Sequence, residues 1–535
     1  MKSLLMHRDR DFDSHDSLRN VMYDYRDAQR ERELQSPAHE RALIQDLELD
    51  VLFREMAGED RFLFEVARKA ILSGIQNDSD SIRYRQQALK DCLSNADIVR
   101  RLYDITVDAT TGTRKLQWDS STYQYLTSLL LYAISLLEAL SEKLKKLRAI
   151  TEESSERFES EAFRRLFAML RKELSDAYLA KIEGHLSDLR FRRGVLLSAE
   201  LDEHNEAVNF TLRQRTKDEP KWLDRLLGKG PPTYTFYIAE RDQAGGKILT
   251  EMRRSGIGRV AVALAQSGEH VLRFFNMLRT ELGFYLCCLN LYNCLVGEGS
   301  AICFPVPAEA GKRAHRFRGL YDVCLALLMK RKIVGNTSDA TGKSLVLITG
   351  ANQGGKSTFL RGVGVAQLMM QAGMFVGAEE FEAELCPALF THYKREEDAS
   401  MKSGKFDEEL ARMSDIADRL VPNSMVLFNE SFAATNEREG SEIARQIVSA
   451  LLEKGVRVFY VTHLFTFARV FWEDGKDQAL FLRAERNPEG VRTYKMVEGE
   501  PLETSYGEDL YRQVFDVERH TSNSQDHSGL SAINA

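Results

Sequence analysis

The chain has 535 residues, of which 43% are hydrophobic and 29% are charged, and its formal net charge is −7. This length predicts two to four domains. The acidic balance excludes a simple basic nucleic-acid module, because phosphate binding requires clustered Lys and Arg. The seven cysteines form no CxxC pair, so neither a zinc site nor a disulfide framework is indicated, and a reducing cytoplasm is expected.

The N-terminal segment becomes strongly charged after six residues, unlike an export signal. From Arg41, apolar residues recur at three- and four-residue steps, and residues 119–195 and 247–295 continue this helical pattern. The longest apolar runs, residues 125–140 and 284–297, are shorter than the roughly 20 residues of a membrane span, so no membrane partner is expected.

Between the helical stretches, residues 194–213 and 233–240 alternate apolar and polar positions, which predicts a small β element. From about Arg331 to Asp516, strand patterns alternate with helix patterns, and this order is typical of an α/β domain. The polar ends of the chain, residues 1–40 and 521–535, are predicted to be flexible.

The strongest motif begins with an apolar strand, Leu345–Thr349, which leads into Gly350-x-x-x-x-Gly355-Lys356-Ser357 and then into a helix. Glycines at this spacing let backbone N–H groups surround phosphate oxygens, and the helix N-terminus adds partial positive charge. In such a loop Lys356 would reach the β- and γ-phosphates and Ser357 would ligate magnesium.

Two later strands deliver polar residues to the same kind of site. Met425–Phe428 leads to Glu430, a candidate base for the attacking water, although an acid here also suits a cap of the next helix. A third strand ends at His463, which is placed to sense a γ-phosphate; a purely structural histidine is the alternative.

These motifs together resemble the MutS mismatch-repair ATPases. TGANQGGKST is similar to the family's TGPNMGGKST, and a Phe-x-x-Glu segment, MVLFNES, TNEREG and VTHLF follow in the family's order, over about residues 315–515. The resemblance implies ATP and Mg²⁺ as cofactors and a head-to-tail homodimer with composite ATP sites. It implies Glu430 and His463 as catalytic residues and Ser357 and Asn429 as metal residues. The implied nucleotide-binding residues are Gly350, Asn352, Gln353, Gly354, Gly355, Lys356, Ser357, Thr358 and Ser403.

The same resemblance gives the predicted fold class: a multidomain protein with an α-helical core and lever region, a small β-containing clamp, and an α/β P-loop ATPase domain of the ABC type. The predicted segments are a flexible lead-in (1–40), a helical core (41–118), lever helices (119–330) with a clamp-like insertion (about 195–245), the ATPase domain (331–520) and a flexible tail (521–535).

Three features depart from the family pattern. Gly404 stands where the signature segment has a serine, so the candidates for contacting the partner's γ-phosphate are Ser403, one step earlier, and a backbone N–H group. Asn429 stands where the family has an aspartate that contacts magnesium through water. This exchange predicts a lower affinity for magnesium but a competent ATPase. Only about 40 residues precede the helical core, and Phe53 of a Phe-x-Glu triplet lies in an apolar-periodic helix, so mismatch recognition is not expected.

The candidate DNA contacts are four basic residues of the clamp-like insertion, Arg213, Arg215, Lys217 and Lys221. A solvated charged loop is the alternative interpretation of this stretch. A DNA-binding ATPase dimer is therefore the first hypothesis. The second is an ATP-driven dimeric assembly or signalling factor that does not bind DNA, and the third is an ATP-binding scaffold that hydrolyses little.

Overall fold

The computed structural model divides the chain into two compact units. Unit 1 comprises residues 1–5 and 95–282, and unit 2 comprises residues 6–94 and 283–535. The structure describes residues 1–12, 38–112, 126–192, 194–204, 207–213, 235–239, 241–309, 311–395, 404–474, 477–487 and 492–501.

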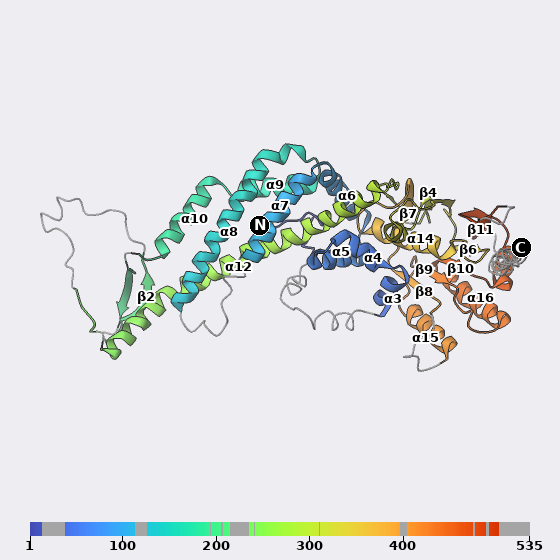
Figure 1. Ribbon diagram of the computed structural model, residues 1–535. Helices are drawn as coiled ribbons and strands as arrows, with labels where there is room; N and C mark the ends of the chain where they lie inside the picture. Colours follow the sequence, from blue (N-terminus) through green and yellow to red (C-terminus); the bar gives the residue numbers. More distant parts are fainter. Residues whose placement is uncertain are drawn as a thin grey trace, which may run out of the picture. The chain divides into compact units, whose positions relative to one another are not determined.

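Unit 1 is built mainly from long helices that run alongside one another (Figure 1). Their apolar stripes meet in a core that joins Leu130 and Ile134 to Leu186, Ile257 and Ala261. Burial of such stripes at three- and four-residue spacing is what stabilises helices of this length. The helices are α7 (Ala96–Gly112), α8 (Leu126–Ser154), α9 (Glu161–Glu173), α10 (Asp176–Leu189) and α12 (Gln243–Gly297), which continues into unit 2.

The alternating stretch after α10 forms an antiparallel pair, β1 (Leu197–Leu201) and β2 (Ala207–Leu212), in which Leu197 lies opposite Leu212. The predicted β element is therefore present in this part. The second alternating stretch differs from its prediction: residues 235–239 belong to no strand, and Phe236 and Tyr237 are 88% and 93% exposed. Among the described residues no strand pairs with this stretch, and an alternating pattern forms a strand only where neighbouring strands and side chains pack against it.

No helix within the described ranges combines the length and the apolar character needed to cross a bilayer. The 55-residue α12 is long enough, but charged residues recur along it.

The first residues of the chain differ from the predicted flexible lead-in. In unit 1, Leu5 is fully buried, and its N–H donates to Glu281 Oε2 at 2.7 Å. In unit 2, Arg85 Nε donates to the Met6 carbonyl at 2.9 Å, and Arg85 Nη2 lies 2.7 Å from His7 Nε2. Burial and the neighbouring guanidinium lower the pKa of His7 to about 3, so the ring is neutral and accepts this bond. The remaining lead-in, residues 13–37, lies outside the described residues.

Unit 2 contains a helical part and an α/β part. In the helical part, Phe53 is fully buried on α4 and packs edge-on against Phe64 at 5.8 Å, which confirms its prediction as a core residue. The helices here are α3 (Ala38–Asp46), α4 (Leu49–Ala57), α5 (Arg61–Ser73) and α6 (Ser79–Ser94).

A six-stranded sheet in the order β12-β11-β6-β10-β9-β8 forms the centre of the α/β part, and all its neighbours pair in parallel except β11 with β12. The strands are β6 (Leu345–Thr349), β8 (Leu389–Tyr393), β9 (Met425–Asn429), β10 (Arg457–Val461), β11 (Ala479–Arg486) and β12 (Arg492–Glu498). The carboxyl ends of β6, β9 and β10 therefore meet at one edge, where ligands bind in such sheets.

Helices cover both faces of this sheet. Val426 and Phe428 of β9 join a core with α15 (Lys405–Ala417), α16 (Glu437–Glu453) and α17 (Phe465–Asp474). Leu427 points to the other face, towards α14 (Lys356–Gln371), as the two-residue repeat of a strand requires. A Cβ at Gly364 would lie 2.7 Å from Leu427 Cδ1, so glycine lets α14 approach the sheet closely.

A smaller sheet in the order β3-β7-β4-β5 completes unit 2. Its strands are β3 (Val306–Ala308), β4 (His315–Leu320), β5 (Asn336–Asp339) and β7 (Glu380–Glu384), and the short helix α13 (Val323–Met329) lies between β4 and β5 in the chain.

Candidate nucleotide site

The loop between β6 and α14 has the shape that a phosphate requires. Gly350 and Gly355 adopt φ of 106° and 87°, in the region that favours glycine. A Cβ at Gly354 would lie 2.7 Å from Ala484 Cβ, so a larger residue would push this loop away from β11. The loop ends at the N-terminus of the 16-residue α14, whose first N–H groups have no partner within the helix and suit an anion.

Lys356 spans the inside of this loop. Its side chain is buried, and Nζ donates to the carbonyl oxygens of Gly350 and Ala351 at 2.9 and 2.8 Å. Burial lowers the pKa of Lys356 to about 8, and the charge of Glu430 opposes this effect. A buried ammonium whose partners are neutral carbonyls would form stronger, charge-assisted hydrogen bonds when a phosphate binds.

Asn429 and Ser357 meet at the start of α14. Ser357 Oγ donates to Asn429 Oδ1 at 2.9 Å, so the amide oxygen of the last β9 residue faces the helix. A hydroxyl and an amide oxygen beside the Glu430 carboxylate are the hard oxygen donors that magnesium prefers. The side chains present therefore fit a magnesium ion that is held mainly by the nucleotide. In the described parts of the chain, no cluster of three or more His, Cys, Asp or Glu side chains is arranged to hold a metal.

Glu430 and His463 form a pair across the ends of β9 and β10. His463 Nε2 lies 2.8 Å from Glu430 Oε1. The hydrogen bond from His463 lowers the pKa of Glu430 despite its partial burial, so the carboxylate is ionised and Nε2 is the donor. An ionised carboxylate that is held through one of its two oxygens is the arrangement that a general base needs.

The backbone at Glu430 is strained. Glu430 has φ of 54° and Phe432 has φ of 61°, values that cost about 1–3 kcal/mol for a residue other than glycine. Neighbouring structure must hold this turn in place, and such strain gathers at functional sites.

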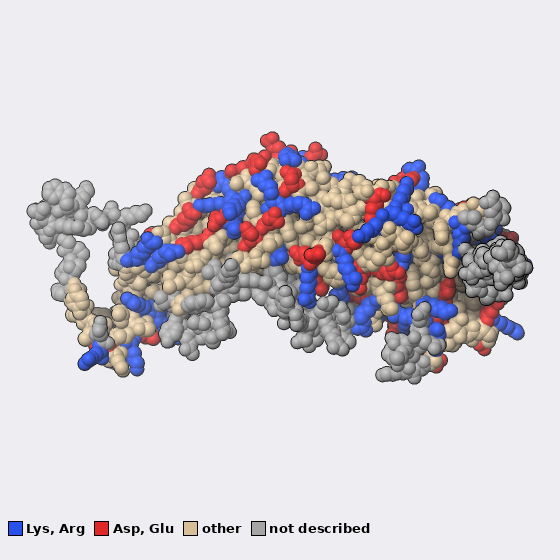
Figure 2. All heavy atoms as spheres, viewed as in Figure 1, with Lys and Arg blue, Asp and Glu red and all other residues tan. Residues whose placement is uncertain are grey.

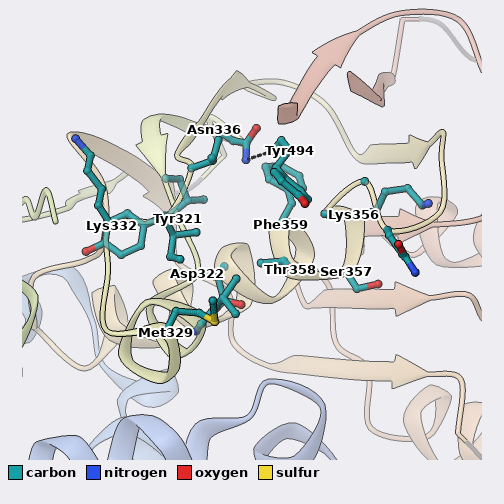
Figure 3. Close-up of a pocket in the computed structure, with 18 of the residues that line it drawn as sticks. Tyr321, Asp322, Met329, Lys332, Asn336, Lys356, Ser357, Thr358, Phe359 and Tyr494 are labelled. Carbon is teal, nitrogen blue, oxygen red and sulfur yellow. Dashed lines mark hydrogen bonds between the residues drawn. The ribbon is translucent and has the colours of Figure 1, made fainter. Parts of the chain in front are cut away.

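Lys356, Ser357 and Glu430 border a cavity of about 560 Å³ in unit 2. In Figure 3, Lys356 and Ser357 lie at one end of it and Tyr321 and Lys332 at the other, with Phe359 and Tyr494 between them. Besides the loop residues, the cavity lining contains the apolar or aromatic side chains of Leu320, Tyr321, Leu325, Met329, Ile333 and Val334 and the polar side chains of Asp322, Arg331, Lys332 and Asn336. A cavity of this size, with a glycine-rich loop at one end and apolar and aromatic side chains in its wall, suits a nucleotide.

Two sequence models match the chain. The one described as MutS2 N-terminal domain matches residues 77–297, and the one described as MutS domain V matches residues 346–516. The chain belongs to the MutS family.

Individual MutS-family relatives match shorter stretches. The chain is 26% identical to "MutS protein homolog 4" of Mus musculus over 204 residues, which is 36% of this chain and 21% of that protein. It is 32% identical to "DNA mismatch repair protein MutS" of Thermus aquaticus over 163 residues (30% and 20%). It is 32% identical to "Endonuclease MutS2" of Thermus thermophilus over 120 residues (22% and 16%). The chain thus spans about a fifth of the length of these relatives.

The structure brings most of the predicted MutS-type site residues together. Glu430 lines the cavity, and Asn429 and His463 join it through their bonds to Ser357 and Glu430. Gly404 is the N-cap of α15, whereas Ser403 lies outside the described residues. The loop residues on the cavity wall are Asn352, Gln353, Gly354, Gly355, Lys356, Ser357 and Thr358. Their roles in this MutS-family chain stay predictions.

Sequence reasoning missed the opposite wall of the cavity. Tyr494 lies on β12, and its carbonyl accepts a bond from Asn336 Nδ2 at 3.4 Å. Asn336 Oδ1 also accepts from the N–H of Met496 at 2.7 Å, so one side chain fixes the Tyr494 segment over the loop. No motif marks these residues, because they come from segments 158 positions apart.

Of the predicted DNA contacts, the structure describes Arg213 alone. It is exposed, and its Nε donates to Ser198 Oγ at 2.8 Å. Arg215, Lys217 and Lys221 lie outside the described residues. On the face shown in Figure 2, basic and acidic side chains are interspersed along the helices of unit 1.

Proposed function

We propose that this MutS-family chain binds ATP in the cavity and hydrolyses it with Mg²⁺. At the level of the family, the domain match supports an ATP-binding, DNA-associated function. The observation that carries the proposal is the meeting of three groups at one edge of the sheet. These groups are the buried Lys356 in its glycine loop, the Ser357–Asn429 pair, and the ionised Glu430 held by His463.

In the proposed reaction, the loop N–H groups and the N-terminus of α14 bind the phosphates. Lys356 exchanges its two loop carbonyls for phosphate oxygens, which is favourable because a charged partner replaces neutral ones. Glu430 orients a water molecule and accepts its proton, while His463 keeps the carboxylate in place. Magnesium, when bound by the phosphates near Ser357 and Asn429, supplies positive charge that stabilises the transferring phosphoryl group.

The half of the cavity away from Lys356 is proposed to receive the nucleoside. Tyr494 and Phe359 lie between this half and the phosphate loop in Figure 3, where a flat base has aromatic surface beside it. Ile333 and Val334, which also line the cavity, offer apolar contact.

For the whole protein, we propose a homodimer with composite ATP sites that associates with DNA without reading mismatches and works in the cytoplasm. The helix α15, which begins after Gly404, is the element proposed to approach the partner's nucleotide. The alternative is a dimeric assembly or signalling factor that does not bind DNA.

The proposed function is tested by measuring phosphate release from ATP in Mg²⁺, together with sedimentation of the chain with and without a non-hydrolysable ATP analogue. Turnover and an analogue-dependent shift to a dimer are the expected results. The absence of turnover with intact analogue binding would leave an ATP-binding scaffold instead.

Replacing Asn429 with aspartate should lower the Mg²⁺ concentration needed for half-maximal ATPase activity. At about 4 Å and an effective dielectric of about 20, a charge pair is worth about 4 kcal/mol, of which desolvation cancels a large part. Maximal turnover should stay level or fall. A second anion near Glu430 raises the pKa of this residue and so opposes the effect of the hydrogen bond from His463, which lowers it. A Mg²⁺ titration of the ATPase rate measures both effects.

The matched control for this titration is Asp415→Asn, which changes an exposed acid on α15 by the reverse exchange. Its Mg²⁺ midpoint should equal that of the unaltered chain. If the Asn429→Asp midpoint also stays unchanged, Asn429 does not lie near the metal, and the assignment of β9 is wrong.

DNA binding, where it occurs, should weaken steeply with salt, since each neutralised phosphate releases counterions. Neutralising Arg213, Arg215, Lys217 and Lys221 together should make the slope of log K against log salt shallower. The expected change is about 0.9 for each DNA phosphate that these side chains no longer neutralise. Filter binding to matched and mismatched duplexes at several salt concentrations measures this slope. A clear preference for the mismatched duplex would contradict the proposed absence of mismatch reading.

A further inference from the structure

The strained turn after β9, Glu430–Phe432, is anchored from several elements. The N–H of Glu430 donates to the Val461 carbonyl at 2.9 Å, and Tyr460 OH donates to the Ser431 carbonyl at 2.8 Å. Both of these anchors belong to β10, the neighbouring strand. They hold the start and the middle of the turn but leave the N–H of Phe432 to be satisfied elsewhere.

Glu409 of α15 satisfies that last N–H. The N–H of Phe432 donates to Glu409 Oε2 at 3.1 Å, across 23 positions of sequence. Glu409 is only 3% exposed, and its Oε1 has no hydrogen-bond partner within the part of the chain that the structure describes. A buried carboxylate with one unsatisfied oxygen is costly, and packing alone would be served better by an apolar side chain.

The charges around Glu409 compensate only in part for its burial. Burial raises the pKa of Glu409, while the bond from Phe432 and the positive charges of Arg412, Lys394 and Lys405 oppose this. On balance the surroundings therefore disfavour the ionised form of Glu409, yet a carboxyl group occupies this position beside the turn. The contact that its side chain makes there is with the backbone N–H of Phe432.

A histidine strengthens the same connection between α15 and the turn. His392 Nε2 lies 3.0 Å from the Glu409 carbonyl, and Nδ1 lies 2.7 Å from Ser431 Oγ. A carbonyl only accepts, so Nε2 carries the proton and Nδ1 does not. The single hydroxyl proton of Ser431 is shared between Nδ1 and the His392 carbonyl oxygen, to which Ser431 Oγ also donates. The imidazole also stacks on the Phe432 ring, with centroids 5.2 Å apart and planes at 22°.

From these contacts we propose that Glu409 is a positioning residue for Glu430. It fixes the end of the strained turn through the Phe432 N–H and thereby holds the catalytic carboxylate at the distance that water activation needs. The proposal rests on the proposed role of Glu430 as the base. Glu409 does not line the cavity, so its effect is expected in the chemical step rather than in binding.

Three variants separate this role from simple packing. Glu409→Met keeps the length of the side chain but removes the acceptor, Glu409→Gln restores an acceptor without charge, and Asp415→Asn changes an exposed acid of the same helix. For each we would measure kcat and KM for ATP, the Kd of a non-hydrolysable ATP analogue, and the hydrogen-exchange rate of the Phe432 amide.

We expect Glu409→Met to lower kcat by about 10- to 100-fold, because a displacement of about 1 Å at a reacting group has this effect. Its analogue Kd should stay within about twofold, and the Phe432 amide should exchange faster. Glu409→Gln should restore most of the kcat and the slow exchange, and Asp415→Asn should match the unaltered chain. Should Glu409→Met not fold, Glu409→Asp, which is one methylene shorter, should give an intermediate loss of kcat with unchanged Kd.

The proposal is overturned if Glu409→Met keeps full kcat, if kcat and analogue binding fall together, or if Phe432 exchange is unchanged. The exchange measurement needs no turnover. A chain whose hydrolysis does not exceed that of Lys356→Ala would contradict the proposed function, whereas unchanged exchange in Glu409→Met would contradict this inference alone.

Discussion

Lys356→Ala is expected to reduce ATP affinity at least about 100-fold, a loss of about 3 kcal/mol. The variant removes the buried ammonium that would pair with the phosphates, and charge-assisted bonds of this kind are the strong ones. It also removes the hydrogen bonds from Lys356 to the carbonyl oxygens of Gly350 and Ala351, of which the Ala351 oxygen keeps the bond from the Gly354 N–H, so the loop is less rigidly held. Titration with a fluorescent ATP analogue measures the Kd directly.

Lys454→Ala is the matched control, because Lys454 is an exposed lysine at the end of α16. It should bind the analogue as the unaltered chain does. Equal affinities for Lys356→Ala and Lys454→Ala would show that the glycine loop is not a phosphate site.

Glu430→Gln is expected to bind ATP normally but to lower kcat by about 10²- to 10⁴-fold, the range that a general base contributes. Glutamine keeps an oxygen that can accept the bond from His463, so the shape of the site is retained. It cannot take a proton from water. Nucleotide should therefore persist in the site, and the proposed closed dimer should accumulate in sedimentation experiments with ATP.

Glu453→Gln, at an exposed position near the end of α16, makes the same chemical change away from the cavity. Its turnover should equal that of the unaltered chain. If Glu430→Gln also turns over ATP at the unaltered rate, Glu430 is not the base, and a helix-capping or structural role would remain.

The phosphate end of the site could be predicted because its signals are local. The strand Leu345–Thr349 has the predicted bounds, and the glycines and Lys356 follow it directly. Short-range steric contacts determine the conformation of such a loop, because few other conformations of these residues satisfy the hydrogen-bonding groups of its backbone. The same holds for β9, where four apolar residues predict a strand whose last side chain reaches Ser357.

The nucleoside end and the support of Glu430 could not be predicted, because they depend on contacts between distant segments. Tyr494 reaches the loop only because β12 pairs with β11 beside β6. Phe432 adopts a left-handed φ although its sequence context contains no adjacent glycine, since surrounding contacts impose it. The few apolar residues near the N-terminus likewise gave no signal that Leu5 and Met6 are buried.

A single-turnover experiment tests the central claim, a competent ATP site despite Asn429. The chain is loaded with labelled ATP, mixed with Mg²⁺ and an excess of unlabelled ATP, and quenched over time. If the site is competent, most of the bound label is converted to ADP before it dissociates. Release of the label as intact ATP, at the rate seen for Glu430→Gln, would show that the site does not hydrolyse ATP and would contradict this claim.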